Sequence, residues 1–418
     1  MKPIKLPTII TSGLLSFCLL LLFLPACRKA EFMPVPEGQA VPYQNINLTL
    51  KDALAASPYT LFKTAWKRSD MDSILKAQGN KVPFTLLVPT DAAFTADGLT
   101  LDVINKTSPA LLDSILLYHT INTNISTQDI KDRKENLKCR TLLQNPYLTV
   151  NPAVYGATVK DPYYYLQYLK LTDGVLFING KTAGQSSPVQ AKDGSIWPID
   201  HVLHKPTKTI LQALQDDGRF GMYLALNQRN DSLYTVVSEG IIFRDFTQGL
   251  APDYTNNIAI YTSVFAIPDA VFHAAGYQTV DDVMNLNNRN PLPTVDYNTY
   301  TVIGGLATDT LIAYHRWGVM FAYYDPNYGG GQQVSNNFYS NDLSNTVLSG
   351  YTLVNSGYSG TYPPYLMPFD FGKSNGAITV AVAGSSHPAA KIVESDINTL
   401  MGPIHVVDHF IVPKDFKF

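Results

Sequence analysis

Apolar residues at helical spacing dominate the early part of the chain. Within residues 57–66, Ser57 and Pro58 are suited to begin a helix, and the apolar side chains that follow share one helical face. Residues 84–88 form a short apolar run bounded by prolines, which predicts a buried strand. Asp91 follows this run, where its carboxylate can cap the next helix by accepting backbone N–H groups. The pattern therefore predicts helices packed around an early buried strand.

Strand-like segments follow these helices. Residues 108–119 begin with Ser-Pro and carry a further apolar helical stripe. The strands expected after this helix are residues 147–150, 163–171 and 175–178, and the turn pair Asn179-Gly180 follows the last of these. We also expect a closing strand in each half, at 196–203 and at 404–412. In the second half, Asn375-Gly376 supplies the matching turn pair. Each half thus predicts helices early and antiparallel strands late.

Three sequence blocks occur twice, in the same order. The pairs are residues 87–94 with 265–272, Tyr118-His119 with Tyr314-His315, and residues 194–201 with 402–409. The offset between the copies grows from 178 (269 − 91) to 196 (314 − 118) to 208 (408 − 200), so the second copy carries insertions. A period this long indicates two whole domains and not a solenoid of small units.

The repeat sets the expected domain boundaries. We expect a first domain at 45–206 and a second at 207–418, with the junction near Pro206, where the first closing strand ends. The second domain contains an insertion around 323–370 that is rich in Tyr, Gly, Asn and Ser. Long loops of this kind are often functional.

The N-terminus has the features of a secretory signal. Lys2 and Lys5 precede an apolar core at 14–24, which is shorter than the ~20 residues that a membrane-spanning helix needs. Small residues then lead to Cys27 in the sequence Leu-Pro-Ala-Cys, which resembles the lipobox of bacterial lipoproteins. We therefore expect a signal peptide at 1–26 and a proline-containing tether at 27–44.

The lipobox resemblance implies a location and a partner. In that family the cysteine is acylated and the signal is cleaved before it, so Cys27 would join the protein to a lipid bilayer. The expected location is the cell envelope of a Gram-negative bacterium, at the outer membrane, facing the periplasm or the surface. The alternative is an ordinary cleaved signal in which Cys27 is incidental. If Cys18 is removed with the signal and Cys27 carries lipid, Cys139 is the remaining thiol, and we expect it to be buried and inert.

Composition and charge narrow the classes of function. The chain has 418 residues, of which 45% are hydrophobic and 16% charged, values that fit a globular protein. The formal charge of -3, from 31 basic and 34 acidic residues, offers no basic excess for a phosphate backbone, so we expect no nucleic-acid partner.

Motifs that carry common chemistries are absent from the sequence. There is no HExxH, paired CxxC, GxxxxGK[ST], GxGxxG or GxSxG, and we expect no catalytic residues, no metal and no cofactor. His201 and His204 would point to opposite faces of a strand. Asp200 and Asp408 are expected to accept backbone or histidine hydrogen bonds. A hydrolase that uses Asp325 and Asp370 is the enzymatic alternative.

The repeated blocks resemble the fasciclin-like domain family. The run ending in Pro-Thr-Asp-Ala-Ala-Phe is similar to the first box of that family, Tyr-His to its central motif, and Ile-Asp-His to its second box. The resemblance covers about residues 45–206 and, more loosely, 207–416. It implies an α+β fold, a tandem pair of β-sandwiches or wedges each flanked by short helices. It also implies a surface module for adhesion or ligand binding that is seldom an enzyme.

Tyrosines are the candidate binding residues. Aromatic rings with hydroxyl tips suit sugar or protein surfaces. The candidates are Tyr324, Tyr328, Tyr358 and Tyr362 in the insertion, and the two pairs Tyr118-His119 and Tyr314-His315. The family resemblance associates the Tyr-His pair with adhesion, whereas a pair at a helix end is more often packed in the core. A first-domain cluster at 163–168 fits ordinary strand residues better than a binding surface.

These observations lead to one expected function and one alternative. We expect a lipid-anchored, non-catalytic adhesion or binding protein of the cell envelope, whose partner is an extracellular or envelope protein or a glycan. The alternative is an accessory lipoprotein that captures glycans beside an outer-membrane polysaccharide uptake system.

Overall fold

The computed structural model describes residues 47–79, 83–150, 160–240, 245–247, 249–252, 257–317, 321–324, 333–334, 337–348, 352–355 and 365–418. Contacts group Ile46–Phe418 into one compact unit. Among the described residues, no helix has the length and apolar character needed to cross a bilayer.

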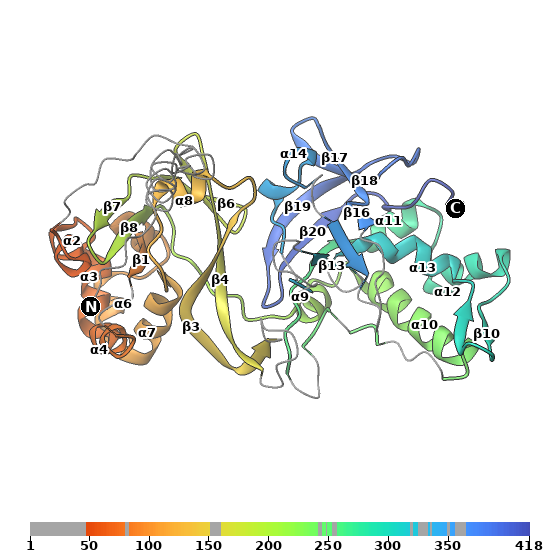
Figure 1. Ribbon diagram of the computed structural model, residues 1–418, viewed down its shortest axis with the longest axis horizontal. Coiled ribbons are helices and arrows are strands. Elements are labelled where there is room, and N and C mark those ends of the chain that lie inside the picture. The colour runs from red at the N-terminus through yellow and green to blue at the C-terminus, as the bar shows by residue number, and fades with distance from the viewer. Residues whose placement is uncertain are drawn as a thin grey trace, which may run out of the picture. The chain divides into compact units, whose positions relative to one another are not determined.

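The first half places short helices before and around an eight-stranded sheet. Its helices are α2 (Leu50–Ala56), α3 (Thr60–Arg68), α4 (Met71–Ala77), α5 (Asp91–Ala96), α6 (Leu101–Lys106), α7 (Pro109–Tyr118) and α8 (Thr127–Lys131). Its strands are β1 (Phe84–Pro89), β2 (Thr120–Ile121), β3 (Leu137–Val150), β4 (Asp161–Thr172), β5 (Val175–Ile178), β6 (Lys181–Gln185), β7 (Val189–Ala191) and β8 (Gly194–Ile199). The strand order is β6-β5-β4-β3-β2-β1-β8-β7. The helices α2, α3 and α4 lie together near β1 and β8 (Figure 1).

The second half repeats the order of helices followed by strands. Its helices are α9 (Ile210–Asp217), α10 (Gly221–Val237), α11 (Asp269–Ala274), α12 (Val280–Met284), η2 (Asn285–Arg289), α13 (Ala307–Ile312), η3 (Ala313–His315), η5 (Ser340–Asp342) and α14 (Asn345–Leu348). Its main sheet has the order β12-β9-β20-β19-β18-β17. These strands are β12 (Arg316–Trp317), β9 (Ser263–Ala266), β20 (Pro403–Val407), β19 (Ala390–Asn398), β18 (Ala377–Val382) and β17 (Phe369–Ser374).

Two smaller sheets belong to insertions in the second half. One is the hairpin of β10 (Thr294–Asp296) and β11 (Thr301–Ile303). The other has the order β14-β13-β15-β16, with β13 (Phe321–Tyr324), β14 (Gln333–Val334), β15 (Thr352–Asn355) and β16 (Tyr365–Leu366). Helices and strands are thus mixed in both halves, which confirms the predicted α+β class.

The closing strand of each half pairs with the first strand of that half in parallel. β1 and β8 run parallel over Phe84↔Gly194 to Pro89↔Ile199. β9 and β20 do the same over Ile404↔Val264 to Val406↔Ala266. The prediction of antiparallel strands is therefore confirmed for the pairing of β8 with β7 and of β20 with β19, and it was wrong for the pairing of each closing strand with the first strand of its half. Strands that meet only after a long connection are free to run parallel, and a local pattern does not fix their direction.

A glycine permits the close approach of these parallel strands in both halves. A Cβ atom on Gly194 would lie 2.2 Å from the carbonyl oxygen of Phe84, and one on Gly402 would lie 2.0 Å from that of Thr262. Both distances are below any real carbon–oxygen contact, so only glycine fits without movement of the backbone. The two halves therefore share a packing constraint as well as a topology.

The turn pairs predicted from sequence are confirmed. Asn179 and Gly180 have φ values of 51° and 80°, and Asn375 and Gly376 have φ values of 50° and 81°. Two consecutive positive φ values are the requirement of the type I′ hairpin turn, which Asn-Gly adopts readily. These turns connect β5 to β6 and β17 to β18.

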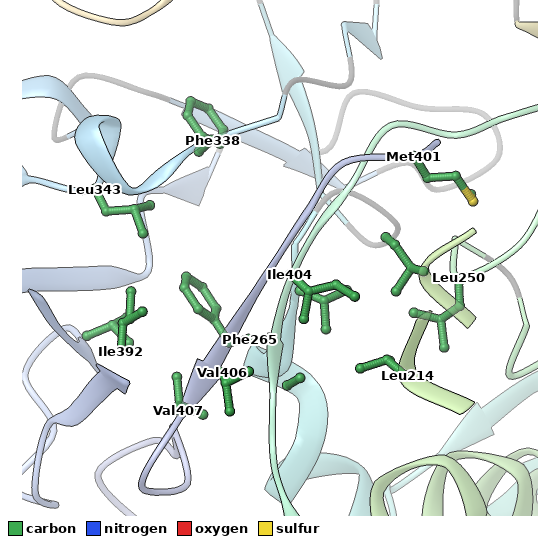
Figure 2. Packing of buried hydrophobic residues seen from close by; sticks show 14 of the residues in the cluster. Leu214, Leu250, Phe265, Phe338, Leu343, Ile392, Met401, Ile404, Val406 and Val407 are labelled. Atoms are coloured by element: carbon green, nitrogen blue, oxygen red, sulfur yellow. The ribbon is translucent and has the colours of Figure 1, made fainter. Parts of the chain in front are cut away.

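Two hydrophobic clusters hold the structure together. The smaller packs α2–α7 against β1 and β8, with Phe62, Phe94 and Leu86 fully enclosed. The larger takes residues from both halves. In Figure 2, Phe338 and Leu343 lie on one side of β20, whereas Leu214 and Leu250 lie on the other. All five residues of β20 are buried, as expected for a strand covered on both faces.

Candidate functional site

His119 connects the end of α7 to the segment after β8. Its Nδ1 lies 2.8 Å from the carbonyl oxygen of Ile115, and its Nε2 lies 3.0 Å from the backbone nitrogen of Leu203. Because Leu203 can only donate through that nitrogen, Nε2 must accept and Nδ1 must carry the proton. The side chain is fully buried. The imidazole therefore has to be neutral to make both hydrogen bonds.

His315 makes a related connection in the second half, from β9 to the segment after β20. Its Nδ1 donates to the carbonyl oxygen of Phe265 (2.8 Å), and its Nε2 accepts from the backbone nitrogen of Ile411 (2.9 Å). The offset between Leu203 and Ile411 is 208 (411 − 203), the same as between the two closing blocks. Burial lowers the pKa of both His119 and His315 to about 4. In both halves the histidine is thus a neutral imidazole that accepts at Nε2 from the segment after the closing strand, whereas Nδ1 donates to its own helix in His119 and to β9 in His315.

The tyrosines of the two pairs pack inside the protein. Tyr118 is 2% exposed and meets Tyr165 edge to face, with 5.7 Å between the ring centroids. Burial raises the pKa of Tyr118 well above its usual value. Tyr314 is half-buried and packs edge to face on Phe369 at 6.1 Å. The binding role predicted for the pairs stays a prediction, and direct contact with Tyr118, His119 or His315 would require this region to open.

Asp91 caps a helix, but a different one from the helix that we predicted. Its carboxylate accepts from the backbone nitrogens of Thr60 (3.1 Å) and Leu61 (2.9 Å), at the start of α3. Thr90 is the residue that caps α5, by accepting from the nitrogen of Ala93 (3.1 Å). Asp91 thus ties the first box to a helix 30 residues earlier in the chain.

Asp269 makes the equivalent link in the second half. Asp269 accepts from the backbone nitrogen of Met222 (2.8 Å), at the start of α10.

Ser57 and Pro58 do not begin α3, so the predicted start of this helix was wrong. The helix begins at Thr60, and Ser57 instead ends α2. Since α3 has no side-chain cap of its own, the distant carboxylate of Asp91 replaces it.

Three histidines near the protein surface each pair with one carboxylate. His201 with Asp200, His204 with Asp97 and His409 with Asp408 all show distances of 2.7 Å. Asp408 also accepts from the backbone nitrogen of Lys391 at 2.7 Å, which confirms the hydrogen-bonding role expected of Asp200 and Asp408. His201 and His204 follow β8, so the predicted strand there ends too late. No group of three possible metal ligands occurs within the described ranges.

Several predicted site residues lie outside what the structure describes. Cys27, Tyr328, Tyr358 and Tyr362 fall in undescribed segments. The backbone of Tyr324 pairs with Gln333 in the small insertion sheet, but its side chain is not described. Their predicted roles are therefore untested. Of the two acids in the enzymatic alternative, Asp325 is also outside the description, and Asp370 is an exposed residue of β17.

The first-domain tyrosine cluster belongs to the core, as expected. Tyr163, Tyr165 and Tyr168 are buried, whereas Tyr164 is half-buried under the guanidinium of Arg140, 3.4 Å from its ring centroid. Cys139 is buried and unpaired, and burial raises the pKa of its thiol to about 12. Such a thiol is a poor nucleophile, which confirms the expectation that it is inert.

The β10–β11 hairpin is an exposed aromatic surface that the sequence analysis missed. Tyr297 and Tyr300, in its turn, are 59% and 70% exposed, and Ile303 at its end is 59% exposed. Tyr300 has a φ of 51°, an uncommon conformation for a bulky residue. The hydroxyl of Tyr297 donates to Glu239 Oε1 at 2.6 Å, two residues after the end of α10. Figure 1 shows β10 close to α10.

The repeat offsets contained a signal for this hairpin. The offset rises by 18 residues (196 − 178) between the first box and the Tyr-His pair. In the first half, α6 and α7 follow each other directly, whereas η2 and the hairpin separate α12 from α13 in the second half. The extra residues therefore form an insertion, η2 and the β10–β11 hairpin, that the first half lacks.

Comparisons with known proteins found a family model that matches part of the chain. A family model described as the Fasciclin domain matches residues 57–205. A solved structure of a FAS1 domain pair from the insect cell adhesion molecule Fasciclin I is similar at 14% sequence identity and a TM-score of 0.30, covering 86% of this chain and 98% of that chain. No curated protein matches the chain.

Proposed function

We propose that this chain, whose residues 57–205 form a fasciclin domain, is a non-catalytic binding protein of the cell envelope. The proposal adds a partner surface and an anchor to the adhesion-type domain. The non-catalytic part of the proposal is supported in the first repeat by His119, because both of its ring nitrogens form hydrogen bonds with backbone atoms. An imidazole held in this way serves as a bridge, and neither nitrogen is free to accept or donate a proton in catalysis.

The observation that carries the proposal is the exposed β10–β11 hairpin. Clustered exposed aromatic and aliphatic side chains on a soluble surface are typical of interaction sites. Tyrosine is well suited to such contacts because its large ring has few rotatable bonds and its hydroxyl can form hydrogen bonds. The left-handed backbone of Tyr300 is also a strained feature of the kind that gathers at functional sites. We assign the hairpin as the contact surface for a protein partner.

Substitution of the hairpin tyrosines tests this assignment. Binding of the wild-type full chain and of the variant Tyr297→Ala/Tyr300→Ala would be measured against individually purified and immobilised envelope proteins from the bacterium that makes this protein. Tyr147→Ala is a matched control because Tyr147 is 82% exposed but belongs to β3 of the first repeat. We expect the hairpin variant to bind about tenfold more weakly or worse, as for interface hot spots, and Tyr147→Ala to bind as the wild type does. Equal binding by all three proteins would refute the hairpin as the contact surface.

A glycan array separates the protein partner from the glycan alternative. Under the proposal, saturable binding appears on envelope proteins and not on any sugar. Saturable binding to one glycan class, lost in Tyr324→Ala/Tyr362→Ala and kept in the hairpin variant, would favour glycan capture by the 323–370 insertion. That result would overturn the proposed partner and surface.

The proposal also includes a lipid anchor on Cys27. Its support is the sequence Leu-Pro-Ala-Cys after a short apolar segment. Several acyl chains, at ~0.8 kcal/mol per buried CH₂ group, would hold the protein stably at a bilayer. Cells fed an alkyne-labelled fatty acid should label the wild type and fail to label Cys27→Ala. Equal labelling of both proteins would remove the anchor from the account, whereas the hairpin proposal would stand.

A further inference from the structure

A pocket opens between the helices α2, α3 and α4 and the strand β1, well apart in sequence from the hairpin. Its volume is about 840 Å³, within the ~300–1,000 Å³ of typical small-molecule sites. Its apolar lining comes from α2, α3, α4 and β1 through Leu50, Leu54, Trp66, Leu75, Phe84 and Leu86. These helices lie together in Figure 1. Such a pocket suits the hydrocarbon part of a ligand.

The charged residues that line the pocket are mostly lysines. Lys51, Lys63, Lys67 and Lys76 line it together with two aspartates, Asp72 and Asp193, for a local charge of +2 (4 − 2). The whole chain, by contrast, carries -3. This local excess of positive charge favours a ligand with an anionic group.

The two aspartates are already committed to holding the pocket together. Asp72 on α4 accepts from Lys51 Nζ (2.7 Å) on α2 and from Trp66 Nε1 (2.8 Å) on α3. Asp193 accepts from the backbone nitrogen of Leu50 at 2.6 Å, which caps α2. One carboxylate therefore joins all three helices, and the apolar wall is fixed by hydrogen bonds at its rim.

The lysines differ in how much of their charge is compensated. Lys51 is paired with Asp72, and Lys63 Nζ donates to the carbonyl oxygens of Ser57 (2.6 Å) and Ala55 (3.2 Å). Lys67 and Lys76 are exposed and have no carboxylate partner among the described residues. These two ammonium groups are the free cations of the pocket, and they stand beside an apolar cavity.

We propose that this pocket binds a single-chain anionic amphiphile, with the hydrocarbon chain against Leu54, Trp66 and Leu75 and the anionic head group at Lys67 and Lys76. The apolar lining and the uncompensated positive charge are the two properties that such a molecule complements. A fatty-acid carboxylate and an alkyl phosphate share this chemistry. The site is independent of the hairpin, so each proposal can fail without the other.

Binding can be measured with a fluorescent fatty acid, dansyl-undecanoate, titrated into the purified full-length chain. We expect saturable binding of one molecule per chain, displaced by laurate or by dodecyl phosphate, and the stronger competitor identifies the preferred head group. The methyl ester of the probe and the cationic dansyl-cadaverine should bind at least about tenfold more weakly, because the head group is then neutral or repelled. Equal binding of the three probes would overturn the assignment of the head group to the lysines.

Two pairs of variants separate the pocket from general effects of charge and size. Lys67→Glu/Lys76→Glu should weaken binding about tenfold, whereas Lys131→Glu/Lys181→Glu changes the net charge equally at exposed positions outside the pocket and should not. Ala55 lines the pocket and Ala56 does not, although both are exposed on α2. We expect Ala55→Phe to block binding and Ala56→Phe to leave it unchanged. The proposal would be overturned if the wild type showed no saturable binding, or if Ala55→Phe and Ala56→Phe bound the probe with equal affinity.

Discussion

The neutral histidine bridge makes the stability of the first repeat depend on pH. His119 accepts a hydrogen bond at Nε2 from the backbone nitrogen of Leu203, and protonation there would set two donors against each other. Burial lowers its pKa from 6.5 to about 4. Between these values the unfolded chain binds a proton that the folded chain does not, so the free energy of unfolding falls as pH falls. A difference of about 2.5 pKa units corresponds to about 3 kcal/mol.

A difference measurement isolates this effect from the other ionisable groups. Urea unfolding of the wild type and of His119→Gln, followed by far-UV circular dichroism, would be compared at pH 7 and pH 4. Glutamine does not titrate, so we expect the advantage of the wild type over the variant to shrink by about 3 kcal/mol on acidification. His204→Gln is the control because His204 is exposed, with 72% of its side chain accessible. The difference in the free energy of unfolding between His204→Gln and the wild type should change much less between pH 7 and pH 4.

The size and the direction of the change both test the argument. His315→Gln should give the same result as His119→Gln, since burial lowers the pKa of His315 to about 4 as well. A wild-type advantage that stays constant from pH 7 to pH 4, or that grows on acidification, would refute the assignment of a buried neutral imidazole.

Two further predictions concern the contact between the parallel strands and Asp342 of η5, whose carboxylate accepts hydrogen bonds from Asn136 of the first half. Gly194→Ala and Gly402→Ala should each lower the free energy of unfolding by about 1–3 kcal/mol in urea titrations, because the new methyl group meets a backbone carbonyl; a loss below measurement error in both would contradict the close approach. Burial raises the pKa of Asp342 to about 6, so its contribution to stability is present below pH 3.8 and is lost as pH rises through about 6. The wild type should therefore lose about 2 kcal/mol relative to Asp342→Asn between pH 4 and pH 7, opposite in sign to the histidine effect, and a flat difference would contradict this.

Local features of the fold could be predicted from the sequence. The strand at 84–88 and the Asn-Gly turns depend on a short apolar run and on two residues that tolerate positive φ, and both are found. The repeated blocks also predicted the order of the elements in the second half. These features are set by neighbours in the chain, which a pattern of residues records directly.

Features that depend on distant partners could not be predicted. The cap of α3 comes from Asp91, and Asn136 donates to Asp342 from 206 residues away, through its backbone nitrogen at 2.8 Å. The parallel pairing of β1 with β8 likewise joins segments about 110 residues apart. Each partner is an ordinary residue on its own, and only the folded chain brings the two together. The hairpin surface was missed for another reason, because its tyrosines follow no regular spacing.

The account depends on the claim that one fold occurs twice in this chain, and hydrogen exchange at two amides tests it most directly. The backbone N–H groups of Leu203 and Ile411 each donate to a buried histidine. In the wild type we predict slow exchange at both amides. His119→Ala should accelerate Leu203 far more than Ile411, and His315→Ala should do the reverse by a comparable factor. Fast exchange of Ile411 in the wild type, or an Ile411 rate unchanged by His315→Ala, would contradict the claim.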